Sequence, residues 1–268
     1  MSEGWDCHGH VFGPYDRYPL AAGRSYTPPE ALLSEYISRL ARLGLSHGVL
    51  VHPSAYGGDL SLLMDVLAEQ PRLRGVIVAR PGDLPTLNGL HEAGVRALRF
   101  SHRSSPGNTF QGSASFEDLL TLTPALADAG LHAELWTDCK VLPDIASQLS
   151  DLPFPVVIDH MGGFDFETGI DDPNFRLLLS LVESGKVWVK LCAYRNLMKA
   201  VSMDQGLPFH QCLVAANPAQ LIWGSDWPHL NVVPAPDALH LLELMKRWTE
   251  NDDVTRQILV SNPKALYE

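Results

Sequence analysis

The feature that most constrains the fold is a regular alternation of short apolar runs with longer amphipathic stretches along the whole 268-residue chain. The runs are rich in Val, Ile and Leu, as in strands that are buried on both faces of a parallel sheet. They lie at 5–11, 47–52, 74–79, 95–100, 131–137, 155–160, 187–192 and 220–225. Eight such strands alternating with helices predict an α/β fold, a single (β/α)8 TIM-type barrel.

The amphipathic stretches between the runs predict helices. In the first, Tyr36, Leu40 and Leu43 share one face, and Gly44 is a suitable residue to end the helix. Helices are expected at 29–43, 59–70, 83–93, 115–129, 141–150, 173–184, 209–216, 235–249 and near 252–260. No linker, repeat or low-complexity tract divides the chain, so we expect residues 1–268 to form one domain of the usual barrel size.

Charge and cysteine content exclude several classes of protein. The formal net charge is −11 and no basic run interrupts the acidic background, so nucleic acid and anionic membranes are not expected partners. No apolar stretch approaches the roughly 18 residues of a membrane span. The four cysteines lack CxxC spacing and no signal-peptide pattern is present, which predicts reduced thiols and a cytoplasmic location. A homo-oligomer is left open.

Histidine and aspartate side chains stand at the ends of several predicted strands. His8 and His10 are two residues apart, so alternation along a strand turns both imidazoles to one face. His160 ends the run at 155–160 and Asp226 follows the run at 220–225. A lone histidine is more often an ordinary core residue, but active sites of this fold lie at the carboxyl ends of the strands. We therefore expect these four side chains to meet at the barrel mouth.

This set of residue types suits the hydrolysis of an ester. The reaction needs a base that activates water and donors aimed at the oxygen where charge develops, and Asp226 facing several imidazoles supplies both. The attraction between the negative charge of Asp226 and the positive charge of nearby imidazolium groups is expected to keep Asp226 ionised and the histidines protonated. Arg99, expected at the end of strand four, and Arg195, expected after strand seven, would hold substrate carboxylates; the alternative for each is a surface ion pair.

Several blocks of sequence resemble the amidohydrolase superfamily, which has His-x-His on strand one, a histidine on strand six and an aspartate on strand eight. The closer resemblance is to the family of 2-pyrone-4,6-dicarboxylate lactonases. The blocks are Asp6-Cys7-His8-Gly9-His10-Val11-Phe12-Gly13-Pro14, Ser25-Tyr26-Thr27-Pro28, His52-Pro53-Ser54-Ala55-Tyr56-Gly57, Gly94-Val95-Arg96-Ala97-Leu98-Arg99-Phe100, Asp159-His160-Met161-Gly162 and Trp223-Gly224-Ser225-Asp226-Trp227-Pro228-His229. They span nearly the whole chain in the expected order.

The resemblance implies a barrel hydrolase that opens a cyclic ester of a carboxylate-bearing ring, an acidic lactone. Asp226 matches the base that activates water, and His8, His10 and His160 match groups that polarise the lactone carbonyl. The residues matched to substrate binding are Arg99, Arg195, Arg103, Tyr26, Ser54, Trp136 and His229.

The resemblance also bears on metals. A lysine that bridges two metals ends strand four in the superfamily, where this chain has Arg99, and the strand-five histidine is missing. A guanidinium repels a cation and is no ligand, so a two-metal centre is not expected. We expect hydrolysis without a required cofactor. The alternative is one zinc ion held by His8, His10 and Asp226, with His160 as a further ligand.

Other substrates and functions remain open. Trp136 stands where the family has a tyrosine contact, and Arg103 lies closer to Arg99 than the family spacing, so a muconolactone-type or sulfonated lactone is an alternative substrate. A zinc-dependent decarboxylase of the same superfamily is disfavoured by the two substrate arginines and the missing histidine. A non-catalytic binding barrel is disfavoured because binding alone does not need a base such as Asp226.

Overall fold

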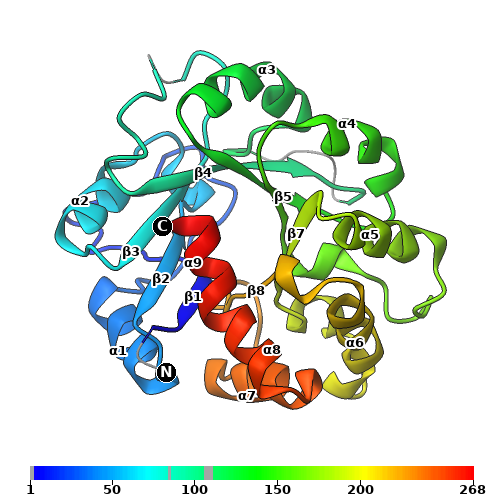
Figure 1. Ribbon diagram of the computed structural model, residues 1–268. Helices are drawn as coiled ribbons and strands as arrows, with labels where there is room; N and C mark the ends of the chain where they lie inside the picture. The colour runs from blue at the N-terminus through cyan, green and yellow to red at the C-terminus, as the bar shows by residue number, and fades with distance from the viewer. Residues whose placement is uncertain (1–2, 84–85, 106–110) are drawn as a thin grey trace.

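The computed structural model of the protein describes residues 3–83, 86–105 and 111–268. Eight parallel strands follow one another around a single sheet in the order of the chain (Figure 1). The strands are β1 (Trp5–Gly9), β2 (His47–Val51), β3 (Leu73–Ile77), β4 (Val95–His102), β5 (His132–Thr137), β6 (Val156–Ile158), β7 (Val187–Leu191) and β8 (Leu221–Trp223). The predicted (β/α)8 barrel is confirmed.

The sheet closes between β8 and β1 just beyond the carboxyl ends of the two strands. Gly9 and Trp227 form a parallel bridge. The backbone N–H of His10 donates to the Trp227 carbonyl, and the N–H of Asp226 donates to the His8 carbonyl, each at 2.8 Å. This closure holds the segment after β8 against the two histidines of the first strand.

Helices surround the barrel, with additional short helical turns in the connections (Figure 1). The α-helices are α1 (Leu33–Leu43), α2 (Ser61–Glu69), α3 (Phe116–Asp128), α4 (Ala146–Asp151), α5 (Pro173–Glu183), α6 (Leu207–Ala216), α7 (Ala238–Thr249), α8 (Asp252–Arg256) and α9 (Asn262–Tyr267). Helix α1 begins later than predicted because Ala31 is extended and pairs with Phe12 in an antiparallel bridge.

The helix predicted at 83–93 is wrong. The described residues of this stretch form turns instead. Gly89 and Gly94 have φ values of +83° and +94°, outside the helical region. An α-helix does not accommodate such positive φ values, so apolar spacing alone misidentified this stretch.

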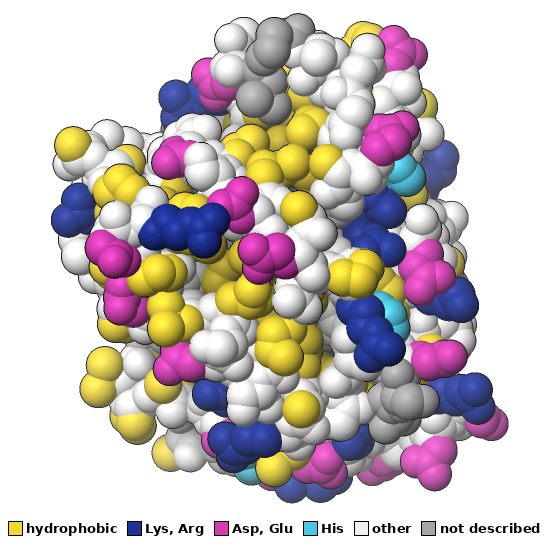
Figure 2. Space-filling view, turned by 90° about the vertical axis from the view of Figure 1, so that its left-hand side faces the viewer, with side chains coloured by type: hydrophobic (Ala, Val, Ile, Leu, Met, Phe, Trp, Pro, Cys, Tyr) yellow, Lys and Arg dark blue, Asp and Glu magenta, His cyan; other side chains and the backbone are white. Residues whose placement is uncertain are grey.

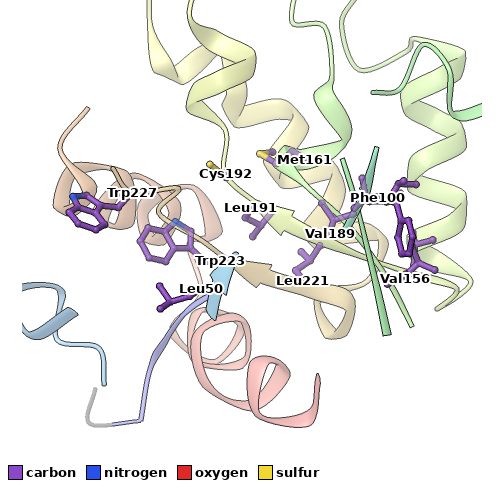
Figure 3. Packing of buried hydrophobic residues seen from close by; sticks show 14 of the residues in the cluster. Leu50, Phe100, Val156, Met161, Val189, Leu191, Cys192, Leu221, Trp223 and Trp227 are labelled. Carbon is purple, nitrogen blue, oxygen red and sulfur yellow. The ribbon is translucent and has the colours of Figure 1, made fainter. Parts of the chain in front are cut away.

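Two hydrophobic clusters stabilise the barrel. The larger lies between the strands and the surrounding helices, and Figure 3 shows part of it, including Phe100 of β4, Val156 of β6, Val189 of β7 and Leu221 of β8. The smaller contains inward-facing apolar residues of the strands together with Leu266 and Tyr267 from α9. Helix α9 crosses the front of the barrel in Figure 1 and closes the end where the strands begin. The opposite end, where the described strands finish, is not covered by this helix.

On the face of the molecule that Figure 2 shows, acidic and basic side chains are interspersed, so neither sign of charge dominates this face. In the described part of the chain, no helix combines the length and the hydrophobicity needed to cross a bilayer.

Candidate active site

A cavity of about 400 Å³ opens where the strands end. It is lined by nine of the predicted site residues: His10, Tyr26, Ser54, Arg99, Arg103, Trp136, His160, Arg195 and Asp226. These come from loops and strands distributed around the barrel, and the fold gathers these nine side chains at one mouth. His8 and His229 are the two predicted residues that do not line the cavity.

Asp226 lies at the base of this cavity with its two carboxylate oxygens in different environments. Oδ2 accepts a hydrogen bond from the Tyr194 hydroxyl at 2.6 Å and is paired with the Arg195 guanidinium. Oδ1 faces Nε2 of His8 at 3.6 Å and Nε2 of His10 at 3.5 Å. Burial alone would raise the pKa of Asp226, but Arg195 and the histidines hold this pKa well below its usual range. One oxygen is therefore fixed, and the other faces the imidazoles as part of an ionised carboxylate.

The loop that presents Asp226 is held by a second buried carboxylate, Asp6. The backbone N–H of Ser225 donates to Asp6 Oδ1 at 2.7 Å, and the Ser225 hydroxyl donates to Asp6 Oδ2 at 2.6 Å. Asp226 itself has a left-handed φ of 59°, and His160 has one of 50°. Such conformations cost free energy in non-glycine residues and are found at functional sites. Local strain is thus concentrated where the two side chains enter the site.

The histidines differ in what fixes their rings. Nδ1 of His10 lies 2.7 Å from the Val51 carbonyl, which can only accept, so Nδ1 carries a proton and Nε2 points toward Asp226. Nδ1 of His8 instead lies 3.2 Å from Lys190 Nζ and 3.4 Å from Asp159 Oδ1. His8 is a fully buried neighbour of the cavity floor.

The expectation that the field keeps all three histidines protonated is wrong for His8 and His160. Burial lowers the pKa of His8 well below its usual value, and burial lowers the pKa of His160 to about 4. The desolvation of an imidazolium outweighs the attraction of the nearby carboxylates at these two sites. Both rings are neutral at pH 7, and each can donate only the single N–H of its tautomer.

The arginines around the cavity are engaged to different degrees. Arg99 donates to Asp159 Oδ2 from Nε at 2.9 Å and pairs with it through Nη2 at 2.7 Å. Arg99 also lies within β4, which continues to His102, and not at its end as predicted. Arg103 follows that strand and lies over the Trp136 ring at 4.1 Å, with no hydrogen-bond partner on Nε among the described residues. With Arg195, three guanidinium groups border the cavity.

Sequence reasoning missed three charged groups below the cavity floor. Lys190 Nζ donates to Glu134 Oε2 at 2.7 Å and lies 3.2 Å from Asp159 Oδ1, and all three side chains are fully buried. A lysine within the otherwise apolar β7 and a glutamate within β5 could have signalled this cluster, because charged residues are almost never buried unless paired. Asp159 also directly precedes His160 in the chain.

Three predicted substrate contacts differ in placement. Tyr26 and Ser54 line the cavity on the side of the first two loops. His229 does not reach it: its Nε2 lies 3.1 Å from the Ser225 carbonyl, and its ring packs edge-on against Tyr194. The structure thus places His229 as support for the loop that carries Asp226.

Three side chains of the site could hold a single metal ion. Ligand atoms of His8, His10 and Asp226 lie within 4.8 Å of one another, and these are ligand types that zinc accepts. His10 also has the Nδ1–H to carbonyl hydrogen bond with Val51 that metal-bound histidines commonly make. The residues fit one metal ion, although Nδ1 of His8 faces the Lys190 ammonium.

A (β/α)8 barrel with a buried carboxylate that faces two histidines, and a third histidine lining the same cavity, defines a class of barrel hydrolases. The chain belongs to the amidohydrolase family, whose sequence profile matches residues 5–268. The predicted resemblance is thereby confirmed.

Characterised relatives extend over nearly the whole chain. It is similar to 4-sulfomuconolactone hydrolases of Hydrogenophaga intermedia (32% identity) and Rhizobium radiobacter (34% identity), with 98% of this chain and 88% and 89% of those proteins covered. It is also 31% identical to a 2-pyrone-4,6-dicarboxylate hydrolase of Comamonas testosteroni, with 98% and 89% covered.

A solved structure shares the fold closely. It is described as a probable 2-pyrone-4,6-dicarboxylic acid hydrolase of Acinetobacter baumannii with citric acid bound, and it matches with a TM-score of 0.84 at 26% identity, over 99% of each chain. The names of these relatives agree with the predicted class, a lactone hydrolase.

Proposed function

We propose that the protein hydrolyses the cyclic ester of a lactone that carries carboxylate or sulfonate groups. The observation that carries this proposal is the position of Asp226, whose Oδ1 faces His8 and His10 at the base of a cavity bordered by three arginines. In a protein of net charge −11, a cavity with this many guanidinium groups favours an anionic ligand. The names of the relatives support the same class of substrate.

The reaction follows from the two roles of the Asp226 carboxylate. Oδ2 stays fixed by Tyr194 and Arg195, while Oδ1 accepts a proton from a water molecule as its oxygen attacks the lactone carbonyl. Imidazole N–H groups of the neighbouring histidines stabilise the negative charge that develops on the carbonyl oxygen. When the ring C–O bond breaks, the departing oxygen takes the proton back from Asp226. The product is the ring-opened acid, and the base is regenerated.

We propose that this reaction requires no metal. The neutral histidines already offer N–H donors, and Arg195 balances the charge of Asp226. If a zinc ion binds to His8, His10 and Asp226, it would supply Lewis-acid polarisation of the carbonyl and lower the pKa of a bound water.

The acidic groups of the substrate are proposed to bind the guanidinium groups above Trp136. A guanidinium binds a carboxylate through two parallel hydrogen bonds, and a sulfonate also presents two coplanar acceptors. Arg103 is the best placed of the three, because Arg99 and Arg195 already pair with Asp159 and Asp226. A relative solved with citric acid supports a site that accepts several carboxylates.

A kinetic panel tests the proposal. 2-Pyrone-4,6-dicarboxylate, a muconolactone, 4-sulfomuconolactone and the dimethyl ester of the dicarboxylate are each offered to the purified enzyme, and ring opening is followed by absorbance. We expect at least one acidic lactone to be hydrolysed with a kcat/KM far above that of the neutral ester. Equal turnover of neutral and acidic lactones would contradict the substrate class, and release of CO2 without ring opening would favour a decarboxylase.

A further inference from the structure

Trp136 stands beside a row of cavity-lining residues on the neighbouring strand. Alternation along β4 places Arg99 and Ser101 on one face, and Arg103 is the first residue after His102, which ends that strand. Ser101 is the register partner of Trp136 on β5, so the position of the indole along the barrel falls between the two arginines. Trp136, Arg99, Ser101 and Arg103 all line the cavity.

Both guanidinium groups face the indole ring. Cζ of Arg103 lies 4.1 Å from the ring centroid of Trp136, and Cζ of Arg99 lies 5.1 Å from it. Both distances are within the roughly 6 Å at which a ring face attracts a cation, and tryptophan gives the strongest such attraction. The indole also meets the His160 ring edge-on, with centroids 6.2 Å apart. Trp136 therefore contacts two arginines and a histidine that line the same cavity.

The two arginines differ in what else holds them. Arg99 is fixed by Asp159, which it contacts through Nε at 2.9 Å and through Nη2 at 2.7 Å. Among the described residues, Arg103 forms no ion pair with a carboxylate, and its buried Nε has no hydrogen-bond partner. The indole face is thus the contact that orients the Arg103 guanidinium, whereas Asp159 keeps Arg99 in place without it.

The main chain next to Arg103 is held independently of the indole. The backbone N–H and the hydroxyl of Ser104 both donate to Asp138 Oδ2 at 2.9 Å. Asp138 directly follows β5, so this contact ties the chain after β4 to the end of the next strand. Removal of the indole is therefore expected to free the guanidinium of Arg103 without releasing the loop that carries it.

The charges around Arg103 favour an added anion. Burial lowers the pKa of Arg103, and the positive charges of Arg99 and Arg195 lower it further, while Asp138 opposes them. A lowered pKa means that the protonated guanidinium is destabilised among these neighbours. A carboxylate or sulfonate bound to Arg103 would offset this cost and would meet two parallel N–H donors.

We propose that Trp136 is a positioning residue for substrate specificity: its indole face holds the Arg103 guanidinium at the cavity wall, where it receives the acidic group of the substrate. Arg99 and Arg195 already pair with Asp159 and Asp226, so Arg103 is the guanidinium left to the ligand among the described residues. The role in the reaction rests on the lactone hydrolysis proposed above. Anion binding by the pair of Trp136 and Arg103 does not depend on turnover.

Binding of two anions tests this pair directly. Isophthalate, which is planar, and citrate, which is flexible, are titrated by calorimetry into the wild type, Trp136→Leu, Arg103→Met and the double variant. We expect Trp136→Leu to weaken binding roughly 3- to 30-fold, the range of a partly desolvated cation–π contact. The double variant should bind no more weakly than Arg103→Met, because the indole acts through Arg103. Losses that add in the double variant, or a wild type that binds neither anion, would overturn the proposal.

Two further variants separate the ring face from the loss of volume. Trp136→Phe keeps an aromatic face and is expected to recover most of the binding that Trp136→Leu loses. Trp188→Leu is the matched control, since it removes a partly buried tryptophan of β7 that packs against the smaller hydrophobic cluster and does not line the cavity. It should lower stability and leave anion binding unchanged. Equal losses in Trp136→Phe and Trp136→Leu, or a similar loss in Trp188→Leu, would overturn the role of the indole face.

Kinetics extend the test to the reaction. For the best acidic lactone, Trp136→Leu is expected to raise KM more than it lowers kcat, and to reduce the preference for the acid over its methyl ester by the factor lost in anion binding. An unchanged preference would contradict the role in specificity. Failure of every lactone as a substrate would instead refute the proposed function, while the anion titrations would still decide whether Trp136 positions Arg103.

Discussion

Asp226 and Asp159 are two buried carboxylates that contact the same histidine, yet only one of them is placed for chemistry. Each pairs with an arginine, Asp226 with Arg195 and Asp159 with Arg99. Each has a pKa well below its usual range, because neighbouring cations outweigh the effect of burial. Asp226 lines the cavity, whereas Asp159 is fully buried and lies outside the lining.

The difference shows how the barrel separates catalysis from support. The Asp226 carboxylate keeps one oxygen facing the imidazoles at the cavity, where a water molecule can approach. The Asp159 carboxylate lies between Lys190 and Arg99 and has no access to the ligand. Burial of a carboxylate in this fold is therefore not enough to make it a general base. One of its oxygens must also face the cavity, where a water molecule can reach it.

The largest expected effect is on the rate when Asp226 is replaced. Asp226→Asn keeps the shape but cannot accept the proton from water, so we expect kcat to fall by about 10²–10⁴-fold. Folding, followed by circular dichroism, and ligand binding, followed by calorimetry, should be nearly unchanged. Activity within a factor of a few of wild type would remove Asp226 from the mechanism.

Asp159→Asn is expected to affect stability instead. Removing one partner from a buried charge cluster leaves Lys190 and Arg99 with a single buried carboxylate, which typically costs about 3–5 kcal/mol of unfolding free energy. Urea titration measures this loss. The exposed pair of Arg176 and Asp171 offers a matched control, because Asp171→Asn should change stability by less than about 1 kcal/mol. Equal losses in the two variants would contradict the supporting role of Asp159.

The arginines should distinguish acidic from neutral substrates. Arg103→Met is expected to lower kcat/KM for the acidic lactone by roughly 10–10²-fold, because a charge-assisted contact is lost. The methyl ester of the same lactone should be almost indifferent to this change. Arg195→Met should impair both substrates, since Arg195 also holds Asp226. Equal sensitivity of the two substrates to Arg103→Met would show that this residue stabilises the barrel mouth and does not bind the ligand.

The smallest expected effect is that of chelation. If hydrolysis needs no metal, extended treatment with a chelator should leave kcat/KM within a factor of about two, and purified protein should contain well under one zinc per chain. Metal analysis by mass spectrometry and assays before and after dialysis measure both. Stoichiometric zinc together with chelator-sensitive turnover would make His8, His10 and Asp226 metal ligands.

Most of the fold could be predicted because it rests on local patterns. Most strands produced a largely apolar run, and parallel strands of a barrel must end at one mouth, which brought Asp226 and His160 together. The helix expected at 83–93 failed because the left-handed glycines at 89 and 94 override apolar spacing, which does not report on backbone dihedrals.

The residues that make up the site could be predicted from the sequence, but the contacts between them could not. That Arg99 pairs with Asp159, and that Lys190 faces His8, depends on register across four strands, which no single segment encodes. The protonation of His8 and His160 was also misjudged, because the cost of burial depends on how completely the barrel excludes water. Such information exists only in the packed structure.

The most direct test of the central claim is a crystal structure of Asp226→Asn soaked with the acidic lactone that the wild-type enzyme hydrolyses best. An intact lactone should lie with its carbonyl oxygen within hydrogen-bond distance of the His10 or His160 imidazole, its acidic groups on the guanidinium groups above Trp136, and a water molecule beside residue 226. A metal ion between the histidines, or a lactone whose acidic groups avoid the arginines, would contradict the account.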